Sequence, residues 1–187
     1  MTIDISKITV RDEVPEDREA VRAVTIDAFA GSDLGHNGEA DLVDVLRESS
    51  QSYLSLVACC EDHLVGHILF TPVAIRSPQT ELHGMGLAPM SVATDWQRKG
   101  IGALLLKTGI DRLSKNNCAF VVVLGHADYY SRYGFVHASG QGVLHGFSGI
   151  PQDVFFIRGV DENARMAVMT DALAYYQPEF GPQHVDR

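Results

Sequence analysis

The chain has 187 residues, of which 45% are hydrophobic and 21% charged, a composition typical of a soluble globular protein. This length predicts a single domain over residues 1–187 with a sizeable core. The formal net charge of −9 disfavours unaided nucleic-acid binding, which depends on Lys and Arg at the phosphates.

The N-terminus and the cysteines indicate the compartment. Residues 1–13 lack the basic and apolar regions of a signal peptide, and no apolar run approaches the ~18 residues of a membrane span. The cysteines, Cys59, Cys60 and Cys118, are odd in number and two are adjacent, which argues against a disulfide framework. We therefore expect a cytoplasmic protein with no membrane partner.

The first part of the chain alternates strand and helix patterns. Residues 7–12 (KITVRD) predict a strand. Pro15 then fits the first turn of a helix, and apolar residues at helical spacing extend this helix over 15–29. A loop is expected over 31–38 and a second helix over 39–49.

The remainder predicts a sheet with a crossover. The run AFVVVLG (119–125) is continuous and β-branched, which favours a strand buried on both faces. The other elements expected are strands over 53–60, 64–75, 85–93, 134–139, 153–160 and 165–176, a connection over 76–84, and helices over 100–115 and 127–133. This order is α+β, with a largely antiparallel meander followed by a strand–helix–strand crossover.

The stretch SVATDWQRKGIGALLL (91–106) places Gly100 and Gly102 where a strand ends and a helix starts. The first N–H groups of a helix lack intrahelical partners, and the helix dipole adds positive charge there. Glycines let these amides approach a phosphate closely, and Arg98 and Lys99 add charge. The stretch predicts an anion site, with a glycine-containing turn that binds nothing as the alternative.

Two nucleotide motifs do not fit this stretch, because a P-loop needs Lys-Ser/Thr and a dinucleotide fingerprint needs a third glycine. The sequence QRKGIG (97–102) resembles instead the pyrophosphate-binding motif of the GNAT superfamily of N-acetyltransferases. A second stretch, VVVLGHADYYSRYGF (121–135), is similar to that family's strand, short helix and Tyr-x-x-x-Gly-Phe signature. The run VGHILFTPV (65–73) further resembles a bacterial branch of small GNAT proteins.

The resemblance implies a GNAT fold over about residues 5–140: a mixed central sheet with a splayed strand, flanked by helices. Residues 141–187 carry no signature of the family. The resemblance also implies acetyl-CoA as cofactor, with its pyrophosphate on the amides of 98–103 and its pantetheine arm beside the splayed strand. Pro89, which lacks an N–H, agrees with a break in the ladder. The cofactor-binding residues implied are Met90, Ser91, Val92, Gln97, Arg98, Lys99, Gly100, Ile101, Gly102 and Ala103.

The family's second motif implies Tyr130 as the acid that protonates the leaving thiolate, with Tyr129 as the alternative one residue away. The base is open, because 84–93 lacks the carboxylate that many relatives carry there. The candidates are Glu81, His126, and Glu39 or Asp41 acting through water, with Ser91 only as a relay. The Asn that many relatives place after the following strand is also missing, so a side-chain contact to coenzyme A is in doubt.

The function implied is transfer of an acetyl group from acetyl-CoA to a primary amine in a ternary complex. A non-catalytic acyl-CoA-binding regulatory domain and an enzyme using a longer acyl-CoA are the alternatives. The acceptor is a small-molecule or protein amine, and Asp33, Glu39 and Asp41 predict a cationic one. No metal is expected, since His63 and His67 would lie ~13 Å apart on a strand. A homodimer is left open.

Overall fold

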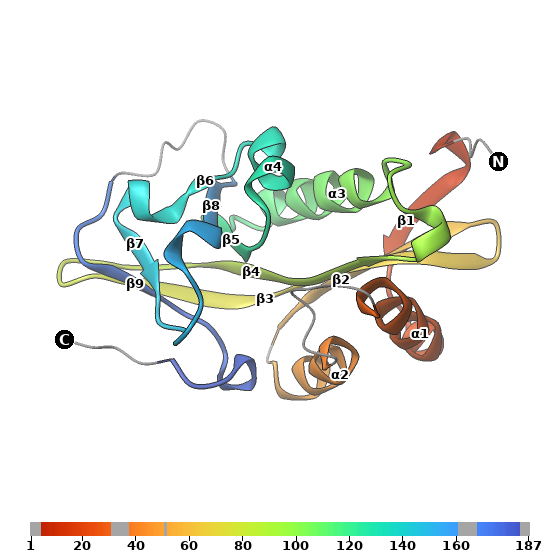
Figure 1. Ribbon diagram of the computed structural model, residues 1–187, viewed down its shortest axis with the longest axis horizontal. Helices are drawn as coiled ribbons and strands as arrows, with labels where there is room; N and C mark the ends of the chain where they lie inside the picture. Colours follow the sequence, from red (N-terminus) through yellow and green to blue (C-terminus); the bar gives the residue numbers. More distant parts are fainter. Residues whose placement is uncertain (1–4, 31–37, 51, 161–167, 184–187) are drawn as a thin grey trace. The chain divides into compact units, whose positions relative to one another are not determined.

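The computed structural model describes residues 5–30, 38–50, 52–160 and 168–183. The chain divides into two compact units. Unit 1 comprises residues 1–70 and 88–112, and unit 2 comprises residues 71–87 and 113–187. Figure 1 labels their elements. The expectation of one domain stays a prediction.

Antiparallel strands form the sheet of unit 1. Strand β1 (Ile8–Asp12) pairs with β2 (Leu54–Cys60), which pairs with β3 (His63–Arg76). The β2–β3 hairpin turns at Glu61, whose φ of 53° lies in the left-handed region. The predicted strands over 7–12, 53–60 and 64–75 are therefore confirmed, with ends shifted by one residue.

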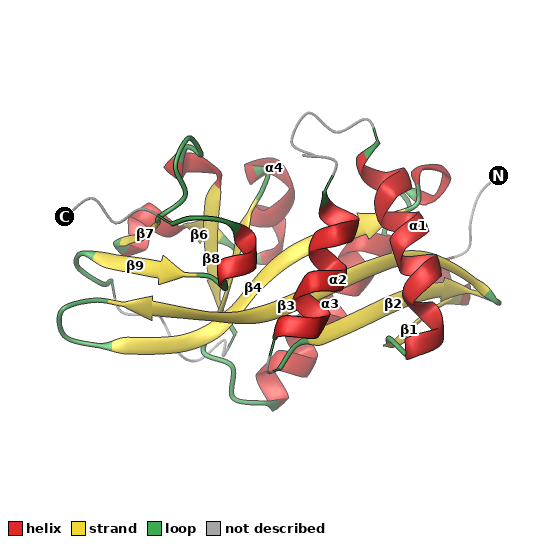
Figure 2. Cartoon of the chain, turned by 90° about the horizontal axis from the view of Figure 1, so that it is seen from below, coloured by secondary structure: helices red, strands yellow, loops and turns green. Residues whose placement is uncertain are grey.

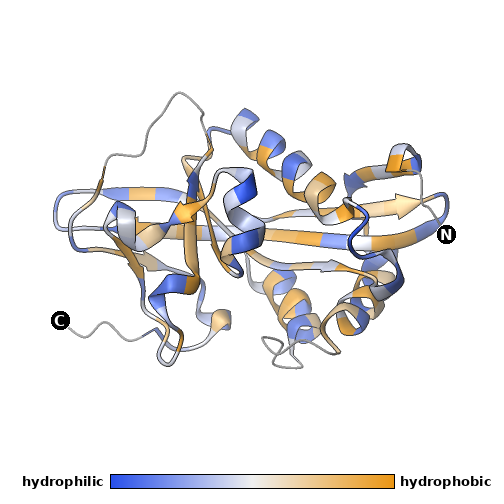
Figure 3. Ribbon diagram, turned by 45° about the horizontal axis from the view of Figure 1, so that its top comes forward, coloured by the Kyte–Doolittle hydropathy of each residue, from blue (hydrophilic) through white to orange (hydrophobic). Residues whose placement is uncertain are grey.

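Helices cover both faces of these strands. A single 3-10 turn, η2 (Pro15–Asp17), leads into α1 (Arg18–Phe29), which lies beside α2 (Glu39–Ser49) in Figure 2. Helix α3 (Ile101–Lys115) packs on the opposite face in Figure 1. Figure 3 shows hydrophilic and hydrophobic residues alternating along these helices, as the predicted periodicity requires.

Two glycines bring α3 close to β3. A Cβ at Gly66 would lie 3.1 Å from Leu105 Cδ1, and a Cβ at Gly109 would lie 2.4 Å from Phe70 Cε2. Real Cβ atoms do not approach a ring as closely as 2.4 Å, and a contact of 3.1 Å is tighter than most. Close packing of α3 on the sheet therefore depends on the missing side chains.

Unit 2 combines parallel and antiparallel pairing. Strand β4 (Glu81–Val92) pairs in parallel with β5 (Phe120–Leu124), as the predicted crossover requires. The remaining strands of this unit are β6 (Val136–His137), β7 (Val143–His145), β8 (Phe155–Gly159) and β9 (Ala172–Tyr175). Strand β8 is antiparallel to β5 and β6, and β9 pairs with β7 in parallel and with β3 antiparallel. The sheet is thus mixed, and a core of rings and β-branched residues, including Phe120, Phe155 and Tyr176, fills the unit.

Several boundaries in unit 2 differ from the sequence prediction. Residues 81–84 belong to β4 rather than to a connection, and a Cβ at Gly84 would lie 2.5 Å from the Phe120 carbonyl oxygen. The predicted strand over 134–139 is reduced to β6, because a 3-10 helix (η5, Ala138–Gln141) follows at once. Strand β7 was not predicted. Of the strand expected over 165–176, only β9 forms in the described part, and 161–167 lie outside it.

The helices between these strands follow the prediction. The short helix expected over 127–133 is α4 (Ala127–Tyr130) continued by the 3-10 turn η4 (Ser131–Tyr133). The remaining 3-10 turns are η1 (Ile5–Lys7), η3 (Thr94–Trp96), η6 (Gln152–Val154) and η7 (Pro178–Phe180). None of the helices in the described ranges is long and apolar enough to cross a membrane.

Candidate active site

The segment between β4 and α3 is held by its own hydrogen bonds. The Ala93 N–H donates to the Val65 carbonyl over 3.0 Å, which ties the end of β4 to β3. The Gln97 side chain donates from Nε2 to the Val92 carbonyl over 3.1 Å. Gln97, expected at the cofactor, therefore also shapes the turn from which α3 starts.

The glycine loop, residues 97–103, leaves backbone amides open. Arg98 and Gly100 have left-handed φ angles of 59° and 88°. The Leu104 N–H donates to the Gly100 carbonyl, while the N–H groups of 101–103 donate to no backbone carbonyl outside the helix in the described part of the chain. Among the described residues, a Cβ at Gly100 would meet only Ile5 Cδ1, at 3.7 Å. The start of α3 thus has room for an anion.

The charge around the glycine loop suits a diphosphate. Helix α3 has 15 residues, so its dipole places partial positive charge at the open amides. The Arg98 side chain is exposed and forms no ion pair with any residue that the structure describes. The Lys99 Nζ contacts the Asp95 carbonyl and lies 5.9 Å from the centre of the Trp96 ring. Together these groups fit the pyrophosphate of coenzyme A.

The end of β4 carries the other residues expected at the cofactor. The parallel ladder between β4 and β5 ends at Leu87 and Val123, two residues before Pro89, as a splayed strand requires. Ser91 is buried, and its Oγ lies 3.2 Å from Thr25 Oγ1 of α1. Met90 and Val92 are half-buried. The Ser91 hydroxyl is thus engaged with α1.

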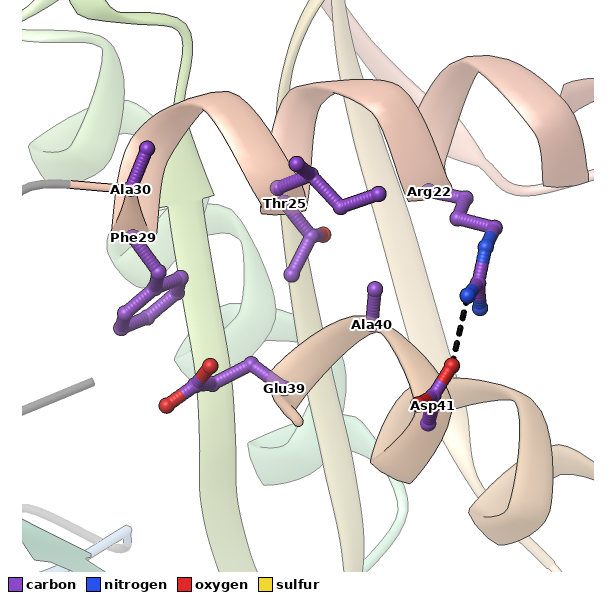
Figure 4. A pocket seen from close by; sticks show the side chains of 8 residues that line it. Arg22, Thr25, Phe29, Ala30, Glu39, Ala40 and Asp41 are labelled. Carbon is purple, nitrogen blue, oxygen red and sulfur yellow. Dashed lines mark hydrogen bonds and ion pairs between the residues drawn. The ribbon is translucent and has the colours of Figure 1, made fainter. Parts of the chain in front are cut away.

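A pocket of about 350 Å³ lies between α1 and α2 (Figure 4). Phe29 and Glu39 stand at one end of the view and the Arg22–Asp41 pair at the other. Arg22 donates to Asp41 over 2.6 Å and to Asp44 over 2.8 Å. Asp33, the third acid expected here, lies outside the described residues. Among the described residues, the pocket is lined by Arg22, Thr25, Ile26, Phe29, Ala30, Glu39, Ala40 and Asp41.

Sequence reasoning missed a buried polar cluster in unit 1. The Glu13 carboxylate accepts hydrogen bonds from Arg47 of α2 and from the Ser55 hydroxyl of β2. Ser55 Oγ also lies 2.8 Å from His67 Nε2 of β3. All four side chains are buried, so the cluster fixes α2 to the sheet. The sequence did contain a signal for this cluster, because Ser55 and His67 are each a polar residue within an apolar run.

Burial sets the protonation of this cluster. Desolvation lowers the pKa of His67, which therefore stays neutral. Burial alone would raise the pKa of Glu13, but nearby His67, the hydrogen bond from Ser55 and the Arg47 charge lower it. Ionised Glu13 accepts the hydrogen bond from the Ser55 hydroxyl, so Ser55 Oγ must accept from His67 Nε2–H. The buried Nδ1 of His67 has no partner in the described part of the chain. Because the carboxylate does not reach Nδ1, this is not a nucleophilic triad.

Packing fixes Tyr130 in unit 2. Its ring lies against Gly125, where a Cβ would be 2.4 Å from Tyr130 Cε2, and meets Phe135 edge-on at 5.5 Å. Gly134 ends the helical turn with a φ of 79°. Burial raises the pKa of Tyr130 above its ordinary value. The Tyr-x-x-x-Gly-Phe pattern therefore produces a buried, protonated phenol.

The neighbouring candidates differ in their surroundings. Tyr129 is half-buried, and burial, followed by nearby Tyr133, raises its pKa as well. His126 is exposed, and its carbonyl accepts from the N–H groups of Tyr129 and Tyr130 over 3.1 and 3.2 Å. His126 is thus the residue directly before α4, four residues from Tyr130 in the chain.

The structure does not bring Glu81 together with Tyr130. Glu81 pairs with Arg76 at 3.2 Å and lies 3.6 Å from His83, on the exposed start of β4. Tyr130 packs at the other end of the ladder, where Leu87 pairs with Val123. Six residues of strand separate Glu81 from Leu87, about 20 Å. Across the described ranges, no group of three His, Cys, Asp or Glu residues could hold a metal ion.

Comparisons with known proteins agree with this architecture. A family model described as an acetyltransferase (GNAT) domain matches residues 9–138. The uncharacterized N-acetyltransferase YjhQ of Escherichia coli strain K12 is 40% identical over 126 residues, which cover 66% of this chain and 67% of YjhQ. The uncharacterized N-acetyltransferase YhbS of the same strain is 34% identical over 67% of this chain and 72% of its own.

Two solved structures extend the similarity over nearly the whole chain. The crystal structure of Escherichia coli YhbS in complex with CoA has a TM-score of 0.79 at 29% identity, covering 93% of this chain and 92% of YhbS. That of a GNAT family acetyltransferase from Brucella melitensis in complex with acetyl-CoA has a TM-score of 0.73 at 28% identity, with coverages of 93% and 98%. The chain belongs to the GNAT acetyltransferase family and has its α+β fold.

Proposed function

We propose that this chain transfers an acetyl group from acetyl-CoA to a primary amine. The observation that carries the proposal is the start of α3, where open amides, Gly100 and the cation Arg98 lie together. The CoA and acetyl-CoA complexes of the two similar structures support the choice of anion.

The glycine loop supplies the proposed cofactor contacts. The N–H groups of Ile101, Gly102 and Ala103 bind the diphosphate, while Gln97 holds the turn and Arg98 and Lys99 neutralise charge. Acetyl-CoA, when bound, supplies a thioester that a neutral amine can attack. Backbone N–H groups between Met90 and Val92 are the proposed donors to the acyl oxygen.

Tyr130 is the proposed acid for the departing thiolate. A tyrosine phenol keeps its proton at neutral pH, and burial raises the pKa of Tyr130 further, so the proton is available to donate. Tyr129 has a pKa raised in the same direction and is the alternative donor. The family signature is the source of both assignments, and Tyr130 is the residue that aligns with its tyrosine.

The pocket between α1 and α2 is the proposed acceptor site. Its lining contains two carboxylates, Glu39 and Asp41, and one cation, Arg22, so the wall of the pocket is acidic. Arg22 is shared by Asp41 and Asp44, which leaves it poorly placed to attract a carboxylate. A cationic amine suits this wall, and its proton passes to water beside the carboxylates. His126 is the other proposed base. Glu81, which pairs with Arg76 at the exposed start of β4, stays a prediction as the base.

The test is a screen of amine acceptors with release of CoA thiol as the readout. Turnover with acetyl-CoA and a cationic amine is expected, with a KM for the amine that rises with salt because screening weakens the attraction. CoA binding without turnover of any amine would favour the regulatory-domain alternative. Faster turnover with longer acyl-CoA donors would favour a different acyl group.

A further inference from the structure

Helix α1 contacts the segment that leads into the glycine loop. The Thr94 N–H donates to Asp27 Oδ2 over 2.6 Å, and the Thr94 hydroxyl donates to the Asp27 carbonyl over 3.2 Å. Thr94 is the first residue of η3, the single turn between β4 and the glycine loop. Both residues belong to unit 1.

The place of Asp27 in its helix is unfavourable by itself. It lies in the last turn of α1 (Arg18–Phe29), where the helix dipole disfavours a negative charge. No Lys or Arg forms an ion pair with it among the residues that the structure describes. The hydrogen bond from the Thr94 N–H to its carboxylate is charge-assisted, and such bonds are stronger than neutral ones. This hydrogen bond therefore offsets the unfavourable interaction of the Asp27 carboxylate with the helix dipole.

The rest of the segment is anchored mainly to itself and to β3. Ala93 is tied to Val65, and the Trp96 N–H donates to the Ala93 carbonyl over 2.7 Å. Thr94 is bound to α1 by its hydrogen bonds with Asp27. Thr25 of the same helix holds Ser91, three residues earlier. Helix α1 thus fixes both the end of β4 and the turn after it.

We propose that Asp27 is a positioning residue that fixes the orientation of the glycine loop for the diphosphate of coenzyme A. The proposal rests on the proposed function, since that diphosphate is the ligand of the loop. Hydrogen bonds weaken steeply when donor and acceptor lose alignment, so amides that must converge on one anion need a fixed turn.

The carboxylate has two opposing effects on CoA binding, which a pair of variants separates. As an acceptor it orders the loop, and as an exposed negative charge it weakly repels the diphosphate across solvent. Asp27→Asn removes the charge and keeps an oxygen that can accept from Thr94. Asp27→Ala removes both. Only the positioning role predicts that these two variants differ.

The experiment is calorimetric titration of CoA into the full chain. We expect Asp27→Ala to weaken CoA binding about fivefold, the scale of one lost hydrogen bond, with an unliganded melting temperature close to that of the wild type. Asp27→Asn should bind as tightly as the wild type or slightly more tightly. The control is Glu19→Ala, an exposed acid in the first turn of the same helix, which should leave CoA affinity unchanged.

A double-mutant cycle tests the partner. Thr94→Pro removes the N–H that Asp27 accepts, and proline is tolerated at the first helical position, as in η2 and η7 of this chain. Ala93 has ψ 137°, which suits the residue before proline. The double variant Asp27→Ala/Thr94→Pro should bind CoA no more weakly than Thr94→Pro alone.

The outcomes separate this proposal from the proposed function. Equal CoA affinity of the wild type and Asp27→Ala overturns the positioning role, as does equal weakening in Asp27→Asn and Asp27→Ala or full additivity with Thr94→Pro. Failure of the wild type to bind CoA overturns the proposed function and the positioning role together.

Discussion

Each of the two units of the chain is stabilised by a different kind of buried interaction. Unit 1 buries ionised and polar groups, with Glu13, Arg47, Ser55 and His67 joining a helix to the sheet. Unit 2 buries rings, with Phe120, Phe155 and Tyr176 in its core and Tyr130 against Gly125. In unit 1, polar contacts fix backbone around an open anion site. In unit 2, burial in an apolar setting keeps a phenol protonated.

The largest expected effect breaks the polar side of this contrast. Glu13→Ala leaves Arg47 with Asp44 as its remaining ion-pair partner among the described residues and removes the acceptor of Ser55. Breaking a buried pair costs about 3 kcal/mol, so the urea midpoint should fall by a corresponding amount. Glu16→Ala, at an exposed site nearby, is the matched control. A midpoint unchanged by Glu13→Ala would mean that the buried cluster does not stabilise the fold.

The next effect tests the aromatic side. Tyr130→Phe keeps the ring packing against Gly125 and Phe135 but removes the proton donor. CoA affinity should stay nearly intact while kcat falls about 10²-fold, the usual scale for a positioned general acid. Tyr129→Phe is the matched variant one residue away. If kcat falls for Tyr129→Phe and not for Tyr130→Phe, the donor has been assigned to the wrong tyrosine.

The smallest expected effect is the pH dependence of stability. The pKa of His67 is lowered by burial from 6.5, so below that pH the unfolded chain takes up a proton that the folded chain resists. The free energy of unfolding should therefore fall as pH drops below 6.5. His145 in unit 2 acts in the same direction, also through burial.

A variant isolates the share that belongs to unit 1. His67→Gln keeps an N–H donor for Ser55 and does not titrate, so the fall in melting temperature between pH 6.5 and pH 5 should become shallower. An identical pH profile in His67→Gln and the wild type would show that His67 is not the titrating group.

Local patterns explain how much of the molecule could be predicted from its sequence. Helix α2 begins and ends where its apolar spacing indicated, at Glu39 and Ser49. The start of α3 followed from Gly100 and Gly102, because glycines, polar residues and an apolar stripe lie within one short stretch. The family resemblance then supplied the fold and the hypothesis for Tyr130.

Contacts between distant segments escaped prediction. Glu13 meets Arg47 and Ser55 across 34 and 42 residues of sequence, and Asp27 meets Thr94 across 67. The sequence around each of these residues does not predict which distant residue it contacts. Strand β7 has three residues and depends on its pairing with β9, so its own sequence carries little signal. The assignments of His126 as base and of the acceptor amine stay predictions.

The most direct test of the account is CoA binding by the wild type and by Gly102→Val, measured by calorimetry on folded protein. The valine methyls would stand beside the amides at the start of α3, where phosphate oxygens must approach. The account predicts that CoA affinity falls by at least about tenfold, or ~1.4 kcal/mol. Equal CoA affinity in the folded variant and the wild type would contradict the assignment of the diphosphate to the glycine loop.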